Sequence, residues 1–470
     1  MLIKKNYVLA ISVFLLMVYI GIRAFTVDFT HDEAYSFHNV KHFWYVEAFC
    51  TANTHWLNSL AMKAAILLGL EHNWQLRWFS TISGWVFCII SFLWIQSLEK
   101  NYYKILAFAL LLCNQFLIDY LGVARGYASG LMLESLSLFL FITNIKKENR
   151  LTGFFTLLCS GMSAIANYSF VYFFAAFAIV HFYTFYIKTK RPFLQNKWFY
   201  IDVLTCVAVS AFIVRAWIFI IKCSNDIGAG TRSICEVCAS FIEGITYYQP
   251  LQLGSLAQAF LSVAIIIIVV IICAYGVFRY KIHQKEVFFY CSLFLSIILT
   301  ILTINFVCFK VVLPFARSAL FMYPLMCICA VYFIEALKFP LKKPIIILFS
   351  LLLAVNFFRT ANFNRILDFT EVENTKTVFD YVDSIGVKNI AISHETYGVY
   401  CNYYQMTDKL KYKFQGEPLE KAHGIYGYDY LLLSPPYTLK PYSHDSIKLD
   451  TVKRFPVNDI VLLKVNHLKS

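Results

Sequence analysis

Eleven stretches of apolar residues dominate this sequence and restrict it to a membrane fold. A transmembrane helix needs about 20 consecutive apolar residues, because the hydrocarbon core of a bilayer is about 30 Å thick. With 59% hydrophobic and 15% charged residues, the chain fits no soluble class. We therefore predict an α-helical polytopic membrane protein with about eleven transmembrane helices. The predicted spans are about 7–24, 76–95, 103–119, 126–144, 151–166, 168–187, 199–221, 257–277, 286–308, 315–335 and 342–358.

The positions of the basic residues predict which side of the membrane each loop faces. Cytoplasmic loops are enriched in Lys and Arg. When the N-terminus is placed in the cytoplasm, every predicted inner loop is basic, from Lys4 and Lys5 at the start to Lys342 and Lys343 before the last span. Topology thus accounts for much of the formal net charge of +13, and we expect no nucleic-acid partner.

Three longer pieces then fall on the outer side of the membrane, at 25–75, 222–256 and 360–470. The last piece is polar, with a helical pattern that runs from Asn374 to near Gly386 and strand patterns in three short runs: 389–393, 430–434 and 459–463. We predict a transmembrane domain at 1–359 followed by a small external α/β domain at 360–470.

An acidic pair, Asp32-Glu33, follows the first span inside the external piece 25–75. Carboxylates at a membrane boundary are costly unless they are solvated, paired or used in chemistry. Two interpretations stay open: a solvated loop whose acids cap the next helix, or a catalytic pair. Asp28, a third acid nearby, is expected to be an ordinary loop residue.

Two further groups of residues are considered as metal sites. Cys235 and Cys238 have CxxC spacing, with Cys223 upstream, but one isolated pair is weak support for zinc, and a local disulfide or free thiols are favoured. The histidines of the first external piece match no tight ligand spacing: His31, His38, His42 and His55. We expect no cofactor, and a divalent metal is the less favoured alternative.

Four short motifs lie on the predicted outer side, in an order that a known group of enzymes shares. They are Asn53-Thr54-His55-Trp56-Leu57, Leu76-Arg77-Trp78-Phe79-Ser80, Ala124-Arg125-Gly126-Tyr127-Ala128, and Leu313-Pro314-Phe315-Ala316-Arg317 followed by Tyr323-Pro324. They resemble, in turn, an Asn-His-Pro-Pro-Leu segment (here without its prolines), Leu-Arg-Leu-Pro-Ser, Ala-Arg-x-Tyr-Ala, and an Arg before a Tyr-Pro pair. With the acidic pair, the likeness covers roughly residues 1–335. The sequence resembles the GT-C membrane glycosyltransferases, in the branch of protein O-mannosyltransferases and the aminoarabinose transferase of lipid A.

The resemblance implies a multi-pass enzyme of the bacterial inner membrane, with its C-terminal domain in the periplasm. It implies transfer of a sugar from a polyprenyl-phosphate donor to an envelope acceptor, which is a lipid, a glycan or a protein. The reaction needs a base for the acceptor's proton and cationic groups for the leaving phosphate. We predict Asp32 as the base, with Glu33 positioning the acceptor or tuning Asp32.

Arginines on the predicted outer side are the expected ligands of the donor phosphate, because a guanidinium binds phosphate through two hydrogen bonds. Arg125 is the leading candidate, and Arg317 and Arg77 follow. The alternative is that they reach to headgroups or anchor spans at the interface. His55, Tyr35 and Tyr127 are predicted substrate contacts, and the two tyrosines also suit packing.

Two other functions compete with the enzyme. A lipid or glycan transporter is less favoured, because no internal repeat is visible and the polar candidates lie at one membrane face rather than at mid-membrane. The remaining alternative is a non-catalytic envelope assembly protein with an external domain.

Overall fold

The computed structural model divides the chain into two compact units. It describes residues 7–42, 55–145, 147–187, 196–223, 230–247, 255–278, 286–369, 372–387, 389–393, 400, 403–404, 406–407, 427–433, 447–455 and 459–467. The first unit comprises Met1–Gly21, Phe49–Ala61 and Trp78–Ala361. The second comprises Ile22–Ala48, Met62–Arg77 and Asn362–Ser470, so it joins the segment with the acidic pair to the C-terminal segment.

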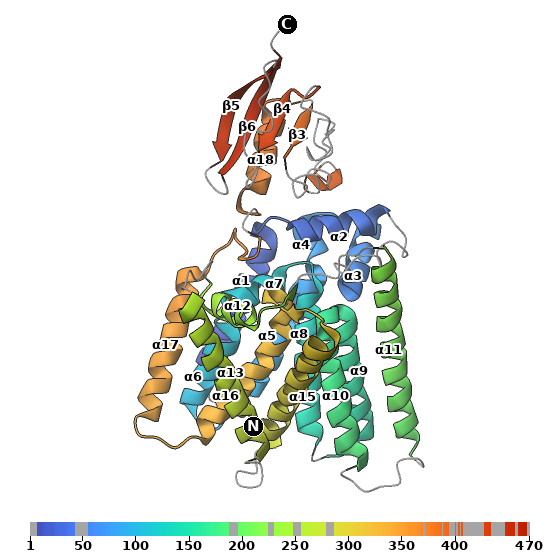
Figure 1. Ribbon diagram of the computed structural model, residues 1–470, viewed down its shortest axis with the longest axis vertical. Helices are drawn as coiled ribbons and strands as arrows, with labels where there is room; N and C mark the ends of the chain where they lie inside the picture. The colour runs from blue at the N-terminus through green and yellow to red at the C-terminus, as the bar shows by residue number, and fades with distance from the viewer. Residues whose placement is uncertain are drawn as a thin grey trace. The chain divides into compact units, whose positions relative to one another are not determined.

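The first unit is a bundle of helices (Figure 1). Two helices, α1 (Tyr7–Thr26) and α3 (Trp56–Leu67), begin in this unit and end in the second. The remaining elements are α5 (Trp78–Ser97), α6 (Asn101–Leu112), α7 (Gln115–Gly122), α8 (Gly126–Asn144), α9 (Arg150–Ala166), η2 (Tyr168–Phe170), α10 (Val171–Phe182), η3 (Tyr183–Ile187), α11 (Lys197–Cys223), β1 (Gly230–Thr231), α12 (Ile234–Thr246), α13 (Ser255–Phe278), α15 (Glu286–Phe309), β2 (Leu313–Pro314), η5 (Ala316–Met322), α16 (Tyr323–Ala336) and α17 (Lys342–Thr360).

The helices agree with the predicted spans. Among the described residues, nine helices are long and apolar enough to cross a membrane, or ten if α6 and α7, bent by 56°, form one span. The remaining predicted span is the shorter apolar helix α9. Each of the eleven predicted stretches therefore contains a helix, and the prediction of a polytopic α-helical membrane protein is confirmed.

The break between α6 and α7 is fixed by hydrogen bonds. The Asn114 side chain caps α7 by accepting the Leu117 N–H (3.1 Å). Its Nδ2 donates to the Tyr323 hydroxyl (2.7 Å), and that hydroxyl donates to the Leu110 carbonyl (2.6 Å). Tyr323, the first residue of α16, thus satisfies backbone and side-chain groups that the break would otherwise leave unpaired in the membrane.

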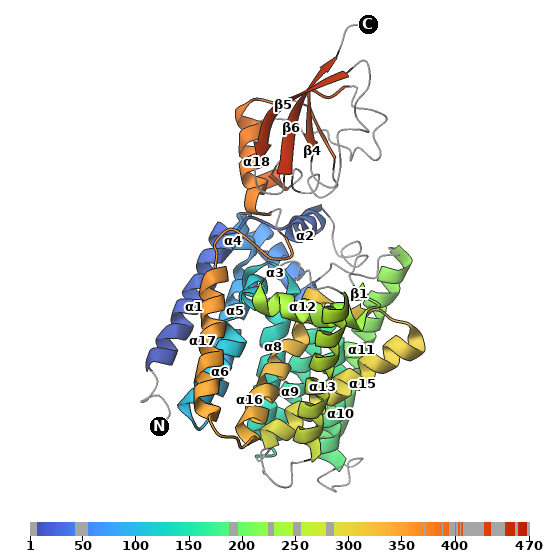
Figure 2. The same cartoon turned by 60° about the vertical axis from the view of Figure 1, so that its left-hand side comes forward.

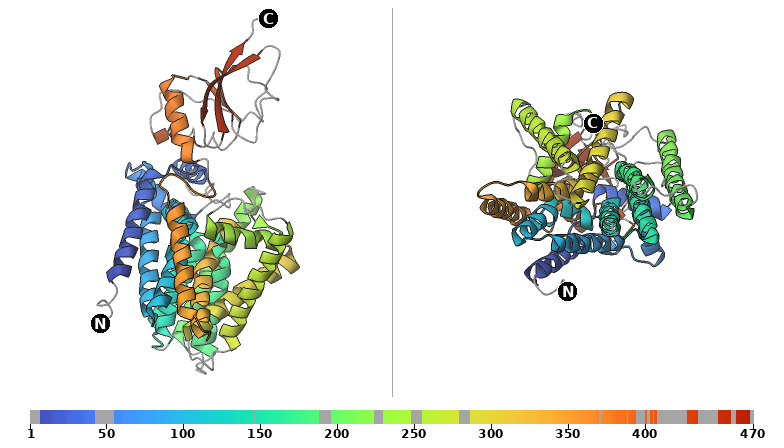
Figure 3. Two further views of the ribbon diagram at one scale, coloured as in Figure 1. Left: turned by 90° about the vertical axis from the view of Figure 1, so that its left-hand side faces the viewer. Right: turned by 90° about the horizontal axis from the view of Figure 1, so that it is seen from below.

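Helix α8 lies at the centre of the packing, in contact with α5 on one side and α9 on another. Figure 2 shows α17 beside α6, and the view from below in Figure 3 shows α11 at the edge of the bundle, where it contacts α9. Small residues permit the closest crossings. A β-carbon at Gly84 would lie 2.8 Å from the Leu121 carbonyl oxygen, so α5 approaches the end of α7 only because this position is glycine.

The second unit contains α2 (His31–His42), α4 (Asn73–Leu76), α18 (Val372–Ser384) and a four-stranded sheet in the order β3-β4-β6-β5. The strands are β3 (Ile390–Ile392), β4 (Tyr430–Leu433), β5 (Ile447–Phe455) and β6 (Ile460–His467). The first two are parallel and the other pairs are antiparallel. The small sheet core is made of Ala391, Leu431, Leu433, Ile447, Leu463 and Val465.

The structure agrees with the helix and the three strands expected in the C-terminal segment and adds β5. Gly386, with φ of +67°, follows α18 in the left-handed conformation that commonly terminates helices. Strand β5 was not predicted from the sequence. Its alternation of apolar and polar residues covers only Ile447 to Asp450 and is interrupted by the irregularity between Thr451 and Lys453.

The residues after α1 pack against the C-terminal segment within the second unit. The Asp28 carboxylate accepts the backbone N–H of Lys376 in α18 (3.0 Å). The Phe29 ring stacks on that of Tyr403, with centroids 4.6 Å apart. Asp28 is therefore not the ordinary loop residue expected from the sequence, and burial raises its pKa to about 6.

Stability of the second unit should fall as pH rises through the range in which Asp28 ionises. Because the pKa rises from 3.8 to about 6 on folding, the folded state binds more protons between these values, and the cost of the buried charge is complete above pH 6. Asp28→Asn should therefore stabilise the protein at pH 7 by on the order of 2 kcal/mol, since the amide oxygen still accepts the Lys376 N–H. The gain should disappear near pH 4. Thermal unfolding of both proteins from pH 4 to 7.5 measures the difference, and a difference independent of pH would contradict the assignment.

Candidate functional site

The acidic pair lies in the first turn of α2, where a capping box fixes it. Thr30 precedes the helix, and its hydroxyl accepts the Glu33 N–H (3.2 Å) while the Glu33 carboxylate accepts the Thr30 N–H (2.8 Å). This reciprocal arrangement is encoded by Thr30 and Glu33 at the spacing T-x-x-E. Glu33 therefore caps the helix, as one of the two interpretations expected, but it is buried rather than solvated.

Glu33 also forms a buried, two-pronged ion pair with Arg77. Nε of Arg77 donates to Oε1 of Glu33 (2.8 Å), and Nη2 donates to Oε2 (2.6 Å). The two side chains are 1% and 0% exposed. A bidentate pair of this kind has strong and directional hydrogen bonds.

The remaining donors of Arg77 bind the backbone at the end of α1. Nη1 donates to the carbonyls of Ala24 (3.3 Å) and Val27 (2.6 Å), and Nη2 donates to that of Asp28 (2.8 Å). With the two bonds to Glu33, these contacts use all five N–H groups of the guanidinium. The geometry favours a positioning role for Arg77, and its predicted contact with phosphate stays a prediction.

Asp32 lies in the same first turn of α2. Its Oδ1 lies 3.7 Å from Nδ1 of His31, and the residue is 8% exposed. The helix N-terminus stabilises the negative charge of Asp32. Tyr35, also on α2, is half-buried. Within the second unit, the fold thus brings Asp32, Glu33, Arg77 and Tyr35 onto or against one short helix.

In the first unit, Arg125 occupies the N-cap position of α8, without a side-chain capping bond, and is 2% exposed. The turn around it is fixed by two polar side chains that sequence reasoning passed over. Asn58 donates to the Ala124 carbonyl (2.6 Å), and Ser80 donates to Asn58 (2.8 Å) and to the Arg125 carbonyl (3.3 Å). Ser80 ends the Leu76–Ser80 motif, so this motif holds the Arg125 turn.

His55 and Tyr127 lie against the same turn. Their ring centroids are 5.5 Å apart, and Tyr127 also contacts Tyr120 at 4.9 Å. A β-carbon at Gly126 would lie 1.9 Å from the Ala166 carbonyl oxygen and 2.8 Å from Nδ1 of His55. Gly126 therefore allows His55 to approach the first turn of α8. Asn53 and Thr54 of the same motif lie outside the described residues.

Arg317 lies on η5, directly after a short strand pair. Strand β2 pairs with β1, with Gly230 opposite Pro314 and Thr231 opposite Leu313. Ala316 has a φ of +48°, a left-handed conformation that costs energy for a non-glycine residue, and its N–H donates to Ser240 of α12 (3.2 Å). Since η5 contacts α8, the element with Arg317 packs against the helix that begins directly after Arg125.

A buried carboxylate on α7, Asp119, was also missed by the sequence reasoning. It accepts hydrogen bonds from Gln115 (2.8 Å) and from Tyr247 at the end of α12 (2.7 Å), and Gln115 accepts one from Tyr19 (3.0 Å). These bonds join α1, α7 and α12. The signal available was an acid inside an apolar stretch, which marks a residue with a partner or a function.

Neither group considered for metal binding forms a cluster in the part of the chain that is described. No group of three or more His, Cys, Asp or Glu side chains suited to a metal occurs there. Cys235 and Cys238 are free thiols on α12, which agrees with one of the two interpretations left open. The side chain of Cys223 lies outside the description.

Loss of the Glu33 charge should destabilise the protein strongly. Glu33→Gln leaves the guanidinium of Arg77 buried without a counter-ion, a change that costs about 3–5 kcal/mol. Glu71→Gln is the matched control, because Glu71 and Lys41 form an ion pair at 2.7 Å whose side chains are 27% and 26% exposed. It should cost about 0–1 kcal/mol. The free energy of unfolding in detergent measures both changes, and equal costs would argue against the role of the buried pair.

Comparison with known proteins identifies the fold. No model of a known protein family matches the chain. Among curated proteins, no sequence matches it either. Two solved structures resemble it over nearly their whole length, at 10% sequence identity. ArnT from Cupriavidus metallidurans in the apo state has a TM-score of 0.51, with 97% of each chain covered. The same protein bound to undecaprenyl phosphate has a TM-score of 0.54, with 98% of each chain covered.

This likeness agrees with the fold predicted from the four motifs and the acidic pair. It extends beyond residue 335, where the motifs end, and includes the C-terminal segment. The chain has the polytopic GT-C fold of ArnT.

Proposed function

We propose that this protein is an integral-membrane glycosyltransferase that moves a sugar from a polyprenyl-phosphate donor to an acceptor in the cell envelope. The observation that carries the proposal is the likeness, over 98% of both chains, to ArnT bound to undecaprenyl phosphate. The buried Arg125, at the N-terminus of a central membrane helix, supports it from this chain's own residues.

Asp32 is the proposed general base. Its carboxylate takes the proton of an acceptor hydroxyl or amine as that atom forms a bond to the anomeric carbon of the sugar. The bond from the anomeric carbon to the phosphate oxygen breaks, and polyprenyl phosphate leaves with the electron pair. Configuration at the anomeric carbon is inverted by this displacement. Asp32 then releases its proton to water.

The negative charge of the leaving phosphate requires cations that are fixed before the reaction. We propose Arg125 and Arg317 for this role. The backbone at Arg125 is held by the hydrogen bonds of Asn58 and Ser80, and the backbone just before Arg317 by the β1–β2 pair and Ser240. His55 and Tyr127, which lie against the Arg125 turn, are proposed substrate contacts.

Glu33 and Arg77 act as positioning residues in this proposal. Their ion pair and the capping box fix the first turn of α2, which carries Asp32. Tyr35 on the same helix is a further proposed substrate contact. We place the reaction on the outer face of a bacterial inner membrane, with the N-terminus in the cytoplasm, on the basis of the basic loops.

The function is tested with purified protein in proteoliposomes that contain a polyprenyl-phosphate-linked sugar with a radioactive label. Transfer of label to envelope lipid, glycan or protein added outside supports the enzyme. Movement of intact labelled lipid between leaflets without transfer would favour a flippase and overturn the proposal.

Asp32→Asn should abolish transfer while the protein still folds. The amide cannot accept the acceptor's proton, and the loss of a general base lowers kcat by about 10²–10⁴. The unfolding midpoint should stay close to that of the wild type, because the capping box uses Glu33. Asp28→Asn is the control, since it removes a neighbouring carboxylate and should retain transfer. Full activity of Asp32→Asn would exclude Asp32 as the base.

Arg125→Lys should weaken use of the donor without changing the charge. An ammonium group cannot form the bidentate contact of a guanidinium with phosphate. We therefore expect kcat/KM for the donor to fall by at least about tenfold. Arg359→Lys, at an exposed position of α17, is the control and should leave kcat/KM unchanged. Unchanged kinetics in Arg125→Lys would assign Arg125 to structure alone.

A further inference from the structure

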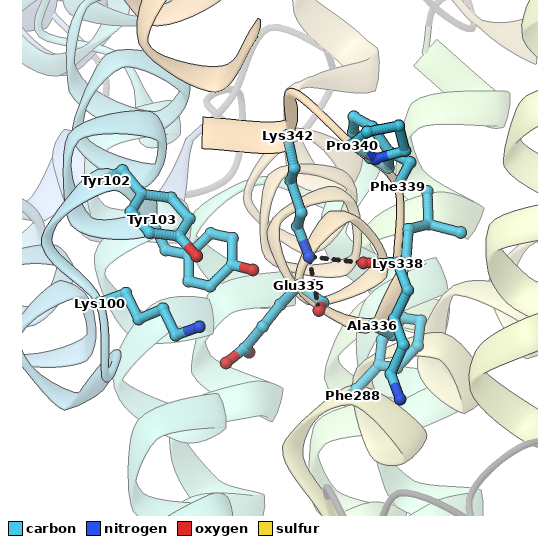
Figure 4. Close-up of a pocket in the computed structure, with 11 residues that line it drawn as sticks. Lys100, Tyr102, Tyr103, Phe288, Glu335, Ala336, Lys338, Phe339, Pro340 and Lys342 are labelled. Atoms are coloured by element: carbon cyan, nitrogen blue, oxygen red, sulfur yellow. Dashed lines mark hydrogen bonds between the residues drawn. The ribbon is translucent and has the colours of Figure 1, made fainter. Parts of the chain in front are cut away.

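A basic cavity lies at the ends of several membrane helices in the first unit, and none of the candidate site residues lines it. It has a volume of about 610 Å³ and is lined by residues from the start of α6, the end of α16 and the start of α17. The side chains that matter are Lys100, Tyr103, Glu335, Lys338, Phe339 and Lys342 (Figure 4). The volume lies in the range of small-molecule sites.

The lining carries a positive charge. Three lysines and one glutamate give it a formal charge of +2. Lys338 is exposed and forms no hydrogen bond or ion pair with the described residues. The single carboxylate, Glu335, leaves an excess of ammonium groups, which favours an anion in the cavity.

One of the lysines is held in a fixed position. Nζ of Lys342 donates to the carbonyls of Glu335 (2.8 Å) and Leu337 (2.6 Å), at the end of α16. It also lies 5.2 Å from the centroid of the Tyr103 ring. Figure 4 shows the ammonium group between this ring and the two carbonyls. Because Lys342 is already ordered, binding an anion there costs little side-chain entropy.

The cavity lies at one surface of the membrane. Helices α6 and α17 begin at it and α16 ends at it, so three spans place it at a bilayer boundary. Its rim is apolar as well as basic: Phe339 is 37% exposed, and the adjoining Leu341 is 72% exposed. Exposed apolar side chains beside lysines suit a lipid, whose headgroup and acyl chains need both, better than a free ion in water.

We propose that this cavity binds the phosphodiester of an anionic phospholipid. The lysines contact the phosphate, and Phe339 and Leu341 contact the first carbons of the acyl chains. By the charge of the neighbouring loops, the lipid belongs to the cytoplasmic leaflet. The site is thus separate from the polyprenyl-phosphate site of the proposed reaction and does not depend on it.

The proposal is tested by native mass spectrometry of the full-length protein released from detergent. Three samples contain phosphatidylglycerol, phosphatidylcholine or undecaprenyl phosphate in the detergent. Two more contain phosphatidylglycerol together with undecaprenyl phosphate or with inorganic phosphate. We expect the wild type to retain phosphatidylglycerol in preference to phosphatidylcholine, with no competition from inorganic phosphate. Undecaprenyl phosphate, which the proposed donor site also binds, should leave the retained phosphatidylglycerol in place. Equal retention of the two phospholipids, or displacement of phosphatidylglycerol by undecaprenyl phosphate or inorganic phosphate, would overturn the assignment to a phospholipid.

Variants locate the binding. Lys100→Gln combined with Lys338→Gln should lower phosphatidylglycerol retention by about tenfold, because both ammonium groups near the phosphate are lost. Both positions are exposed, so the variant should keep the wild-type unfolding midpoint, which is measured alongside. Lys343→Gln, an exposed lysine on the same helix as Lys342 but outside the lining, is the matched control and should retain the lipid. Equal retention by the double variant and the control would show that the cavity is not the site.

Discussion

The buried guanidinium of Arg77 holds together the N-terminal segments of the second unit. One planar group with five donors satisfies carbonyls that the end of α1 leaves without helical partners and, at the same time, balances the charge at the start of α2. Arg77 thus joins the segment after α1 and the first turn of α2 at one buried point within the second unit. A lysine has a single nitrogen and would not reach these acceptors together.

The same contacts give the two neighbouring carboxylates at the membrane boundary different environments. Glu33 is paired and hydrogen-bonded, which compensates the cost of burying its charge. The same arrangement fixes the backbone of Asp32, the residue before Glu33. The hydrogen bonds of the Arg77 guanidinium go to Glu33 and to backbone carbonyls. A residue held in this way needs no reorganisation of its own before reacting, which is the property required of a proposed general base.

The membrane helices could be predicted from the sequence because the bilayer imposes a length and a composition on every span. The capping role of Glu33 was also readable, from Thr30 three residues earlier. The backbone partners of Arg77 could not be predicted, because every residue has a carbonyl and the sequence does not indicate which ones the guanidinium meets. For the same reason Asn58, Ser80 and Asp119 could not be assigned: their partners lie between 4 and 128 residues away, and only the fold brings the distant ones together. At 10% identity to ArnT, the fold persists while most side chains differ.

Among the described strands, β3 and β5 form the two edges of the C-terminal sheet, and each is protected in a different way. Strand β3 has three residues, too few to template a long partner strand, and β5 carries Lys448, Lys453 and Arg454 along an exposed edge. Proteins confined to a membrane meet one another in two dimensions, where sheet edges encounter copies of themselves at high local concentration. Charge repulsion along β5 and the shortness of β3 therefore disfavour strand exchange between neighbouring copies of this domain.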